Sequence, residues 1–223
     1  MRIIFAIFAG VFSITSLATE KEKIEVVSVE YPPYASKHLE GYGSVFRLMS
    51  EYASENLLVD LLPSFVPPAR ADKMMEDGDW CLSIYPPKKG DTSARFVSLS
   101  SDTVKLKLIR LAQRDNFEWS QLSELKGKST AILRSKTPNT LQKKLTEAGV
   151  TLVYVGTVEQ GLLMLLKKRV DFAFGDQSAM LGSKIGQKNI EKLQISQSSL
   201  HEAKIGFFYN TACEAKIFGS LVR

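Results

Sequence analysis

The chain has 223 residues, and its 29 lysines and arginines against 24 aspartates and glutamates give a net charge of +5. The basic side chains are spread along the chain without a dense stripe interleaved with aromatic residues, so we expect no nucleic-acid binding. Two cysteines and two distant histidines show no metal-ligand spacing, which argues against a metal site, and no motif indicates a cofactor.

Residues 1–18 have the pattern of a secretory signal peptide. Arg2 precedes an apolar run over 3–12, and Ser16 and Ala18 place small residues at the −3 and −1 positions of a cleavage site. The run is short for a membrane anchor, which needs roughly 20 apolar residues. We therefore expect cleavage after Ala18 and export to the periplasm, with no later segment that spans a membrane.

The mature chain would keep roughly 205 residues, enough to bury a sizeable hydrophobic core. In an oxidising compartment its two cysteines, Cys81 and Cys213, are candidates for a disulfide. The alternative is a pair of buried free thiols.

The first half of the chain alternates strand and helix patterns. A β-branched strand after the signal peptide ends at Tyr31-Pro32-Pro33-Tyr34, because proline fixes φ and removes a hydrogen-bond donor. Apolar spacing and turn residues mark the elements that follow. The expected strands are 24–29, 57–62, 80–84, 96–99 and 105–112, and the expected helices are 44–56 and 67–77.

A second unit of the same kind begins near Asn116. Glycines at 127 and 149 stop two of its helices. The expected strands are 129–133, 151–155, 171–175, 192–195 and 204–209, and the expected helices are 119–126, 137–148, 157–169 and 177–184.

Two successive blocks of strand–helix–strand alternation imply two small α/β units, each built around a mainly parallel sheet. Ligands of such sheets bind beyond the carboxyl ends of the strands, where helix N-termini point. Two units that face each other therefore predict a ligand-binding cleft.

Five short motifs occur in a characteristic order: Glu30–Tyr34 before Gly41, Arg70 before the acidic turn at 76–78, Arg95 with 96–100, 122–128, and 170–176. Together they resemble the periplasmic solute-binding proteins of the polar amino-acid uptake type, bacterial extracellular solute-binding protein family 3. The resemblance covers most of residues 24–212.

The resemblance implies a type II-like two-lobed fold joined by two crossover strands. The first lobe would comprise 19–110 and 204–223, and the second lobe 111–203. The chain departs from the family in a longer, lysine-containing loop before Arg95 and in a more basic loop after residue 133. It also stops at Arg223, where the family usually continues with another helix or two.

An amino-acid ligand needs a fixed donor for its carboxylate and an acceptor for its ammonium group. The resemblance places Arg95 at the carboxylate position. Arg134, beside an expected helix start, is a second donor, together with the N–H groups of residues Ser135 to Thr137. Asp176 stands at the family's ammonium-binding position, although it is also a natural cap for the helix that follows.

Five further residues are candidate ligand contacts. Tyr31 and Tyr34 follow the first strand and would form an aromatic wall. Arg70 lies near a helix start, and Ser83 and Tyr85 end the third strand. The alternative is a surface ion pair for each arginine and lobe-edge packing for the two tyrosines of the first loop.

The function implied by the resemblance is capture of a small polar ligand by lobe closure. We expect a monomer without cofactor or catalysis that delivers an amino acid, or another small anion, to an inner-membrane ABC permease. A sensory module that signals to a membrane receptor is the first alternative. A dehydratase- or transglycosylase-like enzyme is a second alternative, and it would need a placed general acid or base, for which Glu30 is the one carboxylate besides Asp176 expected near the cleft. A decayed paralogue that binds nothing is a third.

Overall fold

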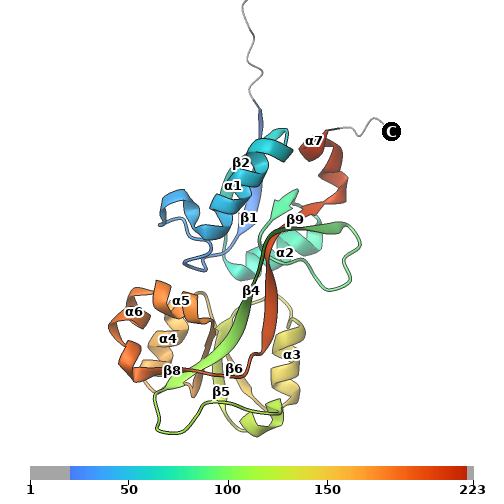
Figure 1. Cartoon of the computed structure of the whole chain (residues 1–223). Coiled ribbons are helices and arrows are strands. Elements are labelled where there is room, and N and C mark those ends of the chain that lie inside the picture. The colour runs from blue at the N-terminus through green and yellow to red at the C-terminus, as the bar shows by residue number, and fades with distance from the viewer. Residues whose placement is uncertain (1–20, 220–223) are drawn as a thin grey trace, which may run out of the picture.

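Two α/β lobes are connected by a pair of long strands in this protein (Figure 1). The computed structural model describes residues 21–219, so the expected signal peptide lies outside the described residues. The connecting strands are β4 (Ala94–Leu111) and β9 (His201–Asn210), which pair antiparallel to each other. Across residues 21–219, every helix is too short or too polar to cross a lipid bilayer.

The first lobe is a sheet with helices on both faces, in the strand order β2-β1-β3-β9-β4. Strands β1, β2 and β3 run parallel, and β9 is antiparallel to β3. Its elements are β1 (Glu22–Ser28), α1 (Ser44–Asn56), β2 (Val59–Phe65), α2 (Pro68–Asp77), β3 (Leu82–Ser83) and α7 (Glu214–Phe218).

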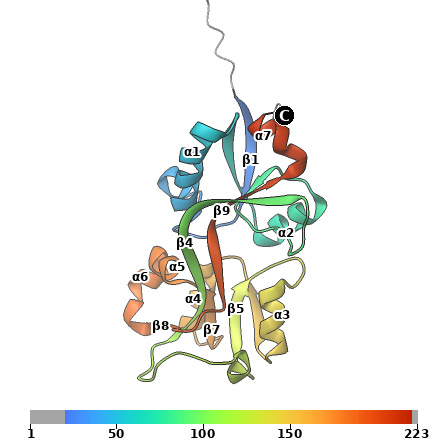
Figure 2. The same ribbon diagram turned by 45° about the vertical axis from the view of Figure 1, so that its right-hand side comes forward.

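Successive residues of β1 explain why helices cover both sides of this sheet. Val26 packs in one core with Phe46 and Met49 of α1, whereas Val27 packs in another with Ala71 and Met75 of α2. All six are almost fully buried. Because side chains alternate along a strand, an apolar run of this kind requires cover on each face. Figure 2 shows α1 and α2 on opposite sides of β1.

The second lobe repeats this plan around β5, which pairs parallel with β6 and β7. Ala131 of β5 packs with Leu162 on one face, and Ile132 packs with Leu145 on the other. Its elements are β5 (Ser129–Leu133), α3 (Thr140–Glu147), β6 (Thr151–Val155), α4 (Val158–Leu166), β7 (Phe172–Gly175), α5 (Gln177–Gly182), α6 (Lys184–Lys188) and β8 (Leu193–Ile195).

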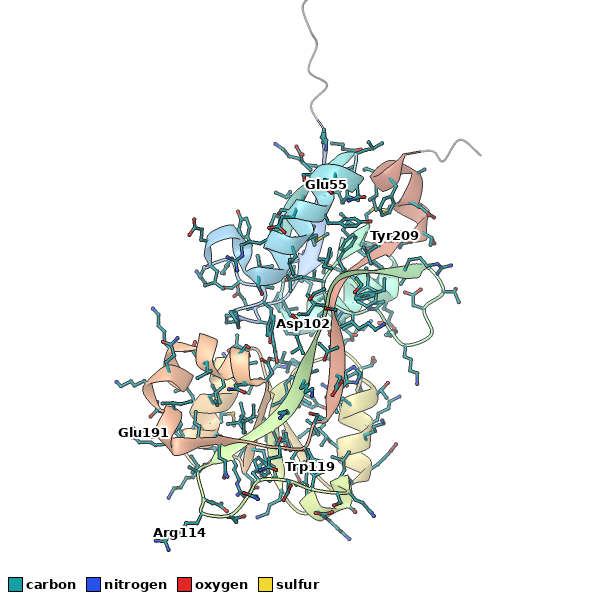
Figure 3. All side chains as sticks on the ribbon, viewed as in Figure 1. Glu55, Asp102, Arg114, Trp119, Glu191 and Tyr209 are labelled. Atoms are coloured by element: carbon teal, nitrogen blue, oxygen red, sulfur yellow. A yellow bond between two sulfur atoms is a disulfide. The ribbon has the colours of Figure 1, made fainter. Side chains whose placement is uncertain are left out.

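The crossover strand β4 belongs to both lobes. Its first part pairs with β9, and its last residues pair with β7 and β8 of the second lobe. The register of the β4–β9 ladder shifts between Ser98 and Thr103, and Asp102 lies between the lobes in Figure 3. The sequence predicted two extended segments here, 96–99 and 105–112; the structure joins them, because pairing with β9 resumes after this irregularity.

Several expected boundaries were wrong for local reasons. The expected strand 80–84 is only the short β3. The expected helix at 177–184 breaks at Ser183, whose hydroxyl accepts a hydrogen bond from the Gly186 N–H (2.8 Å) and so starts a new helix. The helix expected from Thr137 begins only at Thr140, because Pro138 disfavours a helical conformation of the residue before it.

A disulfide joins Cys81 and Cys213, with their Cα atoms 5.5 Å apart and 132 positions separating them in sequence. It attaches the C-terminal segment to the first lobe. There Ile217 is fully buried, and its carbonyl accepts a hydrogen bond from the Leu58 N–H (2.9 Å). The disulfide therefore links the C-terminal segment to the sheet of the first lobe.

Replacing both cysteines, Cys81→Ser with Cys213→Ser, should lower the free energy of unfolding by about 2–5 kcal/mol, because the unfolded chain regains the entropy of a long closed loop. Urea unfolding followed by circular dichroism measures this difference. A double variant with the same unfolding midpoint as the oxidised protein would contradict the expectation.

Candidate functional site

The candidate site lies where the carboxyl ends of β1, β3, β5 and β7 meet between the lobes. The turn after β1 contacts α5, and α2 contacts the loop that follows β5. A Cβ added to Gly182 of α5 would lie 3.0 Å from Cδ of Pro33, so the two lobes touch closely at this point. Parallel α/β sheets place their ligand sites at these strand ends.

The turn at residues 31–35 carries two of the predicted tyrosines. The Tyr31 N–H donates to the carbonyl of Ala35 (2.8 Å). The first N–H groups of α1, from Ser44 and Val45, donate to the carbonyls of Pro33 (3.1 Å) and Tyr34 (3.0 Å). The first donors of α1, which have no partner within the helix, therefore fix the turn to the first lobe.

Gly43 makes this attachment possible. Its φ of +101° is in the region that favours glycine, and a Cβ there would lie 2.6 Å from the carbonyl oxygen of Tyr34. The turn at residues 31–35 can therefore pack on the start of α1 only if residue 43 is glycine.

Asp176 of the second lobe is the carboxylate that this turn reaches. Its Oδ1 accepts hydrogen bonds from the Ala179 N–H (3.0 Å), as the cap of α5, and from the Tyr34 hydroxyl (3.0 Å). The residue is 3% exposed, and within residues 21–219 its Oδ2 has no hydrogen-bond partner. The alternative role of Asp176 as a helix cap is therefore present in the structure, and ammonium binding stays a prediction.

Tyr31 and Tyr34 remain protonated at neutral pH. Their rings stack with centroids 5.9 Å apart. Burial, and then the negative charge of Asp176, hold the pKa of Tyr31 well above its usual value. Burial raises the pKa of Tyr34 to about 12; a hydrogen bond with Ser178 opposes this rise and Asp176 adds to it. The buried Tyr31 hydroxyl lies beside Asp176, and its interaction with that carboxylate adds to the rise of its pKa, although no hydrogen bond of normal geometry joins them within the described residues.

A second carboxylate, Asp72 of α2, crosses the interface in the other direction. Its Oδ2 accepts hydrogen bonds from the backbone N–H groups of Lys136 (3.0 Å) and Thr137 (3.2 Å), in the loop after β5. Asp72 is buried, at 8% exposure. Burial, and then the charge of Asp72, raise the pKa of Tyr85 to about 12, which places that predicted tyrosine beside this contact.

An ion pair supports the same contact one helical turn later. Glu76 receives the Nζ of Lys136 from the second lobe (2.6 Å) and the Nζ of Lys88 from its own lobe (2.9 Å). Asp72 and Glu76 are four residues apart and therefore share one face of α2. That face holds the loop after β5.

Two of the other predicted polar residues, Ser83 and Ser135, make hydrogen bonds within their own lobes. The buried Ser83 hydroxyl donates to the carbonyl of Tyr85 (2.7 Å) and accepts from its N–H (3.0 Å). The Ser135 hydroxyl donates to Oε1 of Gln142 (2.6 Å), a residue that also helps to cap α3. Thr137 contributes its backbone N–H, as described above.

The three predicted arginines are not brought to the carboxylates. Arg95 is exposed and donates to the carbonyls of Thr92 (2.8 Å) and Ala94 (3.0 Å). It pairs on the sheet with Tyr209, which lies within the first lobe in Figure 3. Arg70 and Arg134 are exposed, and Arg134 is not beside a helix start, because α3 begins six residues later.

Asp72 is the site residue that the sequence analysis missed. An aspartate in a helix with acidic and basic neighbours usually faces solvent. Its one distinguishing sign is position: α2 follows the carboxyl end of β2, so the start of this helix points toward the predicted cleft.

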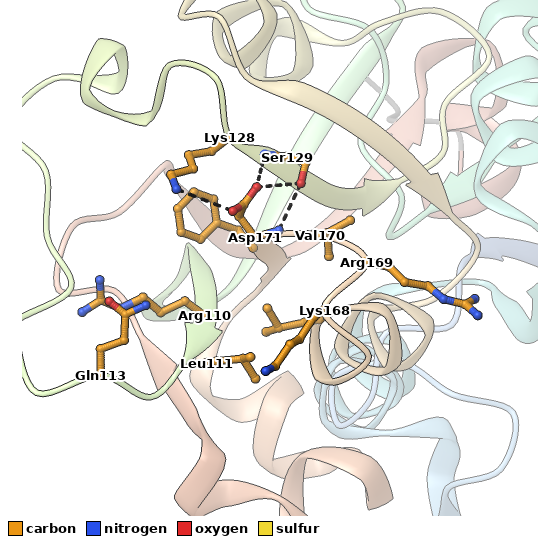
Figure 4. Close-up of a pocket in the computed structure, with 11 residues that line it drawn as sticks. Arg110, Leu111, Gln113, Lys128, Ser129, Lys168, Arg169, Val170 and Asp171 are labelled. Carbon is orange, nitrogen blue, oxygen red and sulfur yellow. Dashed lines mark hydrogen bonds and ion pairs between the residues drawn. The ribbon is translucent and has the colours of Figure 1, made fainter.

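A separate hollow of about 480 Å³ lies on the second lobe, at the amino ends of β5 and β7 (Figure 4). There Asp171 accepts from the N–H and hydroxyl of Ser129, both at 2.8 Å, and Arg110 pairs with Asp115 (3.0 Å). Asp176 follows the opposite end of β7, so this hollow is not part of the interlobe site. In the described part of the chain, no group of three or more His, Cys, Asp and Glu side chains is placed to hold a metal ion.

No protein-family model and no curated protein matches this sequence. Solved structures do match over most of the chain. The GluR0 ligand-binding core from Nostoc punctiforme in complex with L-glutamate has a TM-score of 0.63 and 15% identity, covering 86% of this chain and 87% of that chain. An ancestral arginine-binding protein bound to arginine has a TM-score of 0.65 and 17% identity, covering 86% of each chain.

The VFT2 domain of BvgS from Bordetella pertussis also matches, with a TM-score of 0.59 and 13% identity, covering 85% of this chain and 81% of that chain. The chain therefore has the two-lobed fold of the periplasmic binding proteins, which confirms the predicted fold class and the fold-level resemblance to amino-acid-binding proteins.

The cross-lobe ion pair gives a pH-dependent signal. Hydrogen bonds from Lys136, and then from Lys88, lower the pKa of Glu76 from 4.5 to about 2. A lowered pKa means that the pair supports closure above about pH 4.5 and loses this effect as the pH falls through about 2. We expect Lys136→Met to raise the pKa of Glu76, as measured by carboxyl-carbon NMR titration.

The matched control is Lys143→Met, which removes an exposed lysine of the second lobe and should leave the titration of Glu76 unchanged. An unaltered Glu76 titration in Lys136→Met would show that the ion pair across the lobes does not form.

Proposed function

We propose that this protein is a periplasmic solute-binding protein, which captures a small polar ligand between its lobes and passes it to an inner-membrane ABC permease. The proposal rests on the environment of Asp176. This buried carboxylate lies between the lobes at the end of β7, and one oxygen has no partner within residues 21–219. A buried carboxylate of this kind is expected to bind a donor.

The surroundings of Asp176 suit a ligand with an ammonium or guanidinium group. The carboxylate supplies the acceptor and the charge, and the stacked rings of Tyr31 and Tyr34 supply an apolar, electron-rich wall. The comparison structures of this fold hold arginine and L-glutamate, which supports an amine-bearing ligand of similar size.

Binding would proceed by opening and closing of the lobes. The register shift in β4 is the natural hinge, since both crossover strands pass through this region. Opening separates Tyr34 from Asp176 and exposes both to the ligand. Closure then removes water and strengthens the charged hydrogen bonds. These residues bind and orient, so the proposal includes no covalent step.

A thermal-shift screen of the oxidised protein against amino acids, organic acids and amines tests this proposal. We expect at least one small polar compound to raise the unfolding midpoint. Asp176→Asn should weaken its binding by about tenfold or more, because a charged hydrogen bond is lost. Asparagine still caps α5, so the variant should fold.

Asp171→Asn is the matched control, because Asp171 also lies in the second lobe but at the other end of β7. It should leave the ligand-induced shift in place. A screen in which no compound shifts the midpoint, or in which Asp176→Asn binds as tightly as the original protein, would overturn the proposal.

A further inference from the structure

Two backbone N–H groups of the second lobe, those of Lys136 and Thr137, donate across the interface to the first lobe. Adjacent N–H groups in a loop form a natural binding place for an anion. Here both donate to one oxygen of Asp72, at 3.0 and 3.2 Å, so a carboxylate of the protein itself occupies this place.

Asp72 is held in this position by its own helix. Ala71 and Met75 are buried in the core between α2 and β1, which fixes the rotation of the helix. Glu76, on the same face, receives the side chain of Lys136. The Asp72 carboxylate is therefore held at the interface by its own hydrogen bonds and by the Glu76–Lys136 ion pair one helical turn later.

A ligand carboxylate that sought the same two N–H groups would meet a buried negative charge. It would have to displace Asp72, or share the donors with it at a distance where two carboxylates repel strongly. Displaced but still buried, Asp72 would lose its hydrogen bonds, and a buried carboxylate without partners is costly.

The arginines do not offer a replacement donor at this place. The guanidinium of Arg95 is bonded to two carbonyls of its own loop, and Arg70 and Arg134 are exposed. The interface between the lobes instead carries two carboxylates, Asp72 with Tyr85 beside it and Asp176 with the stacked rings of Tyr31 and Tyr34 beside it. Negative charge and aromatic faces favour a cation.

We infer that Asp72 determines specificity: it excludes α-carboxylates, so the site selects organic cations that lack one, such as diamines and guanidino-amines, over amino acids. This inference rests on the proposed function and names the substrate class of the same site. One cationic group would bind Asp176 at Oδ2, the oxygen that has no hydrogen-bond partner within residues 21–219.

Matched pairs of compounds that differ only by a carboxylate test the inference. Isothermal titration calorimetry would compare agmatine with arginine, cadaverine with lysine, and putrescine with ornithine. We expect at least one amine to bind about tenfold or more tighter than its amino acid, in line with the cost of an unpaired buried charge.

Asp72→Ala should then bind the amino acid of that pair about tenfold more tightly and lose the preference, because the N–H groups of Lys136 and Thr137 become free. Asp72→Asn, which keeps the shape and removes the charge, should move the preference in the same direction. Asp77→Ala, an exposed acid on the same helix, should leave it unchanged.

Three outcomes would overturn the inference while the proposed function stands. The first is an amino acid that binds the original protein as tightly as its amine. The second is an amine preference that persists in both Asp72 variants. The third is a result in which another compound of the broader screen binds but none of the six paired compounds does. If no compound binds at all, the proposed function itself fails.

Discussion

One hydrogen-bonded contact governs how the two halves of this protein meet: the Asp72 carboxylate on the N–H groups of Lys136 and Thr137. A charged acceptor bonded to two backbone donors is among the stronger polar contacts available to a protein. Since the contact is buried, its loss would leave a charge without partners. The lobes therefore either satisfy Asp72 together or separate far enough for water to do so.

Within residues 21–219, the rest of the fold leaves few other contacts to set how the two lobes meet. Each lobe has a sheet covered on both faces, so each moves as a unit, and the disulfide attaches the end of the chain to the first lobe. The proposed opening of the lobes would therefore be concentrated in β4 and β9, where the register shifts. At the other side of the interface, Tyr34 bonds to Asp176, so the lobes are bridged at two places by hydrogen bonds of opposite direction.

The sequence predicted the two-lobed fold well, because strand and helix periodicity follow directly from which faces are buried. It also placed Tyr34 and Asp176 at the carboxyl ends of strands, where parallel sheets bind ligands, and the structure brings these two side chains into contact. The role of Arg95 at the ligand stays a prediction from a resemblance in local sequence; in the structure its exposed side chain donates to the carbonyls of Thr92 and Ala94 just before it. Asp72 was missed because its partners are backbone N–H groups, and these have no signature in sequence.

The most direct test of the central contact is the amide NMR spectrum of the second-lobe loop. If Asp72 accepts from Lys136 and Thr137, then Asp72→Asn should move both amide protons to higher field and speed their exchange with solvent. The Gly127 amide, bonded to the Gly149 carbonyl within the second lobe, should stay unchanged. Identical Lys136 and Thr137 resonances in the variant and the original protein would contradict the account.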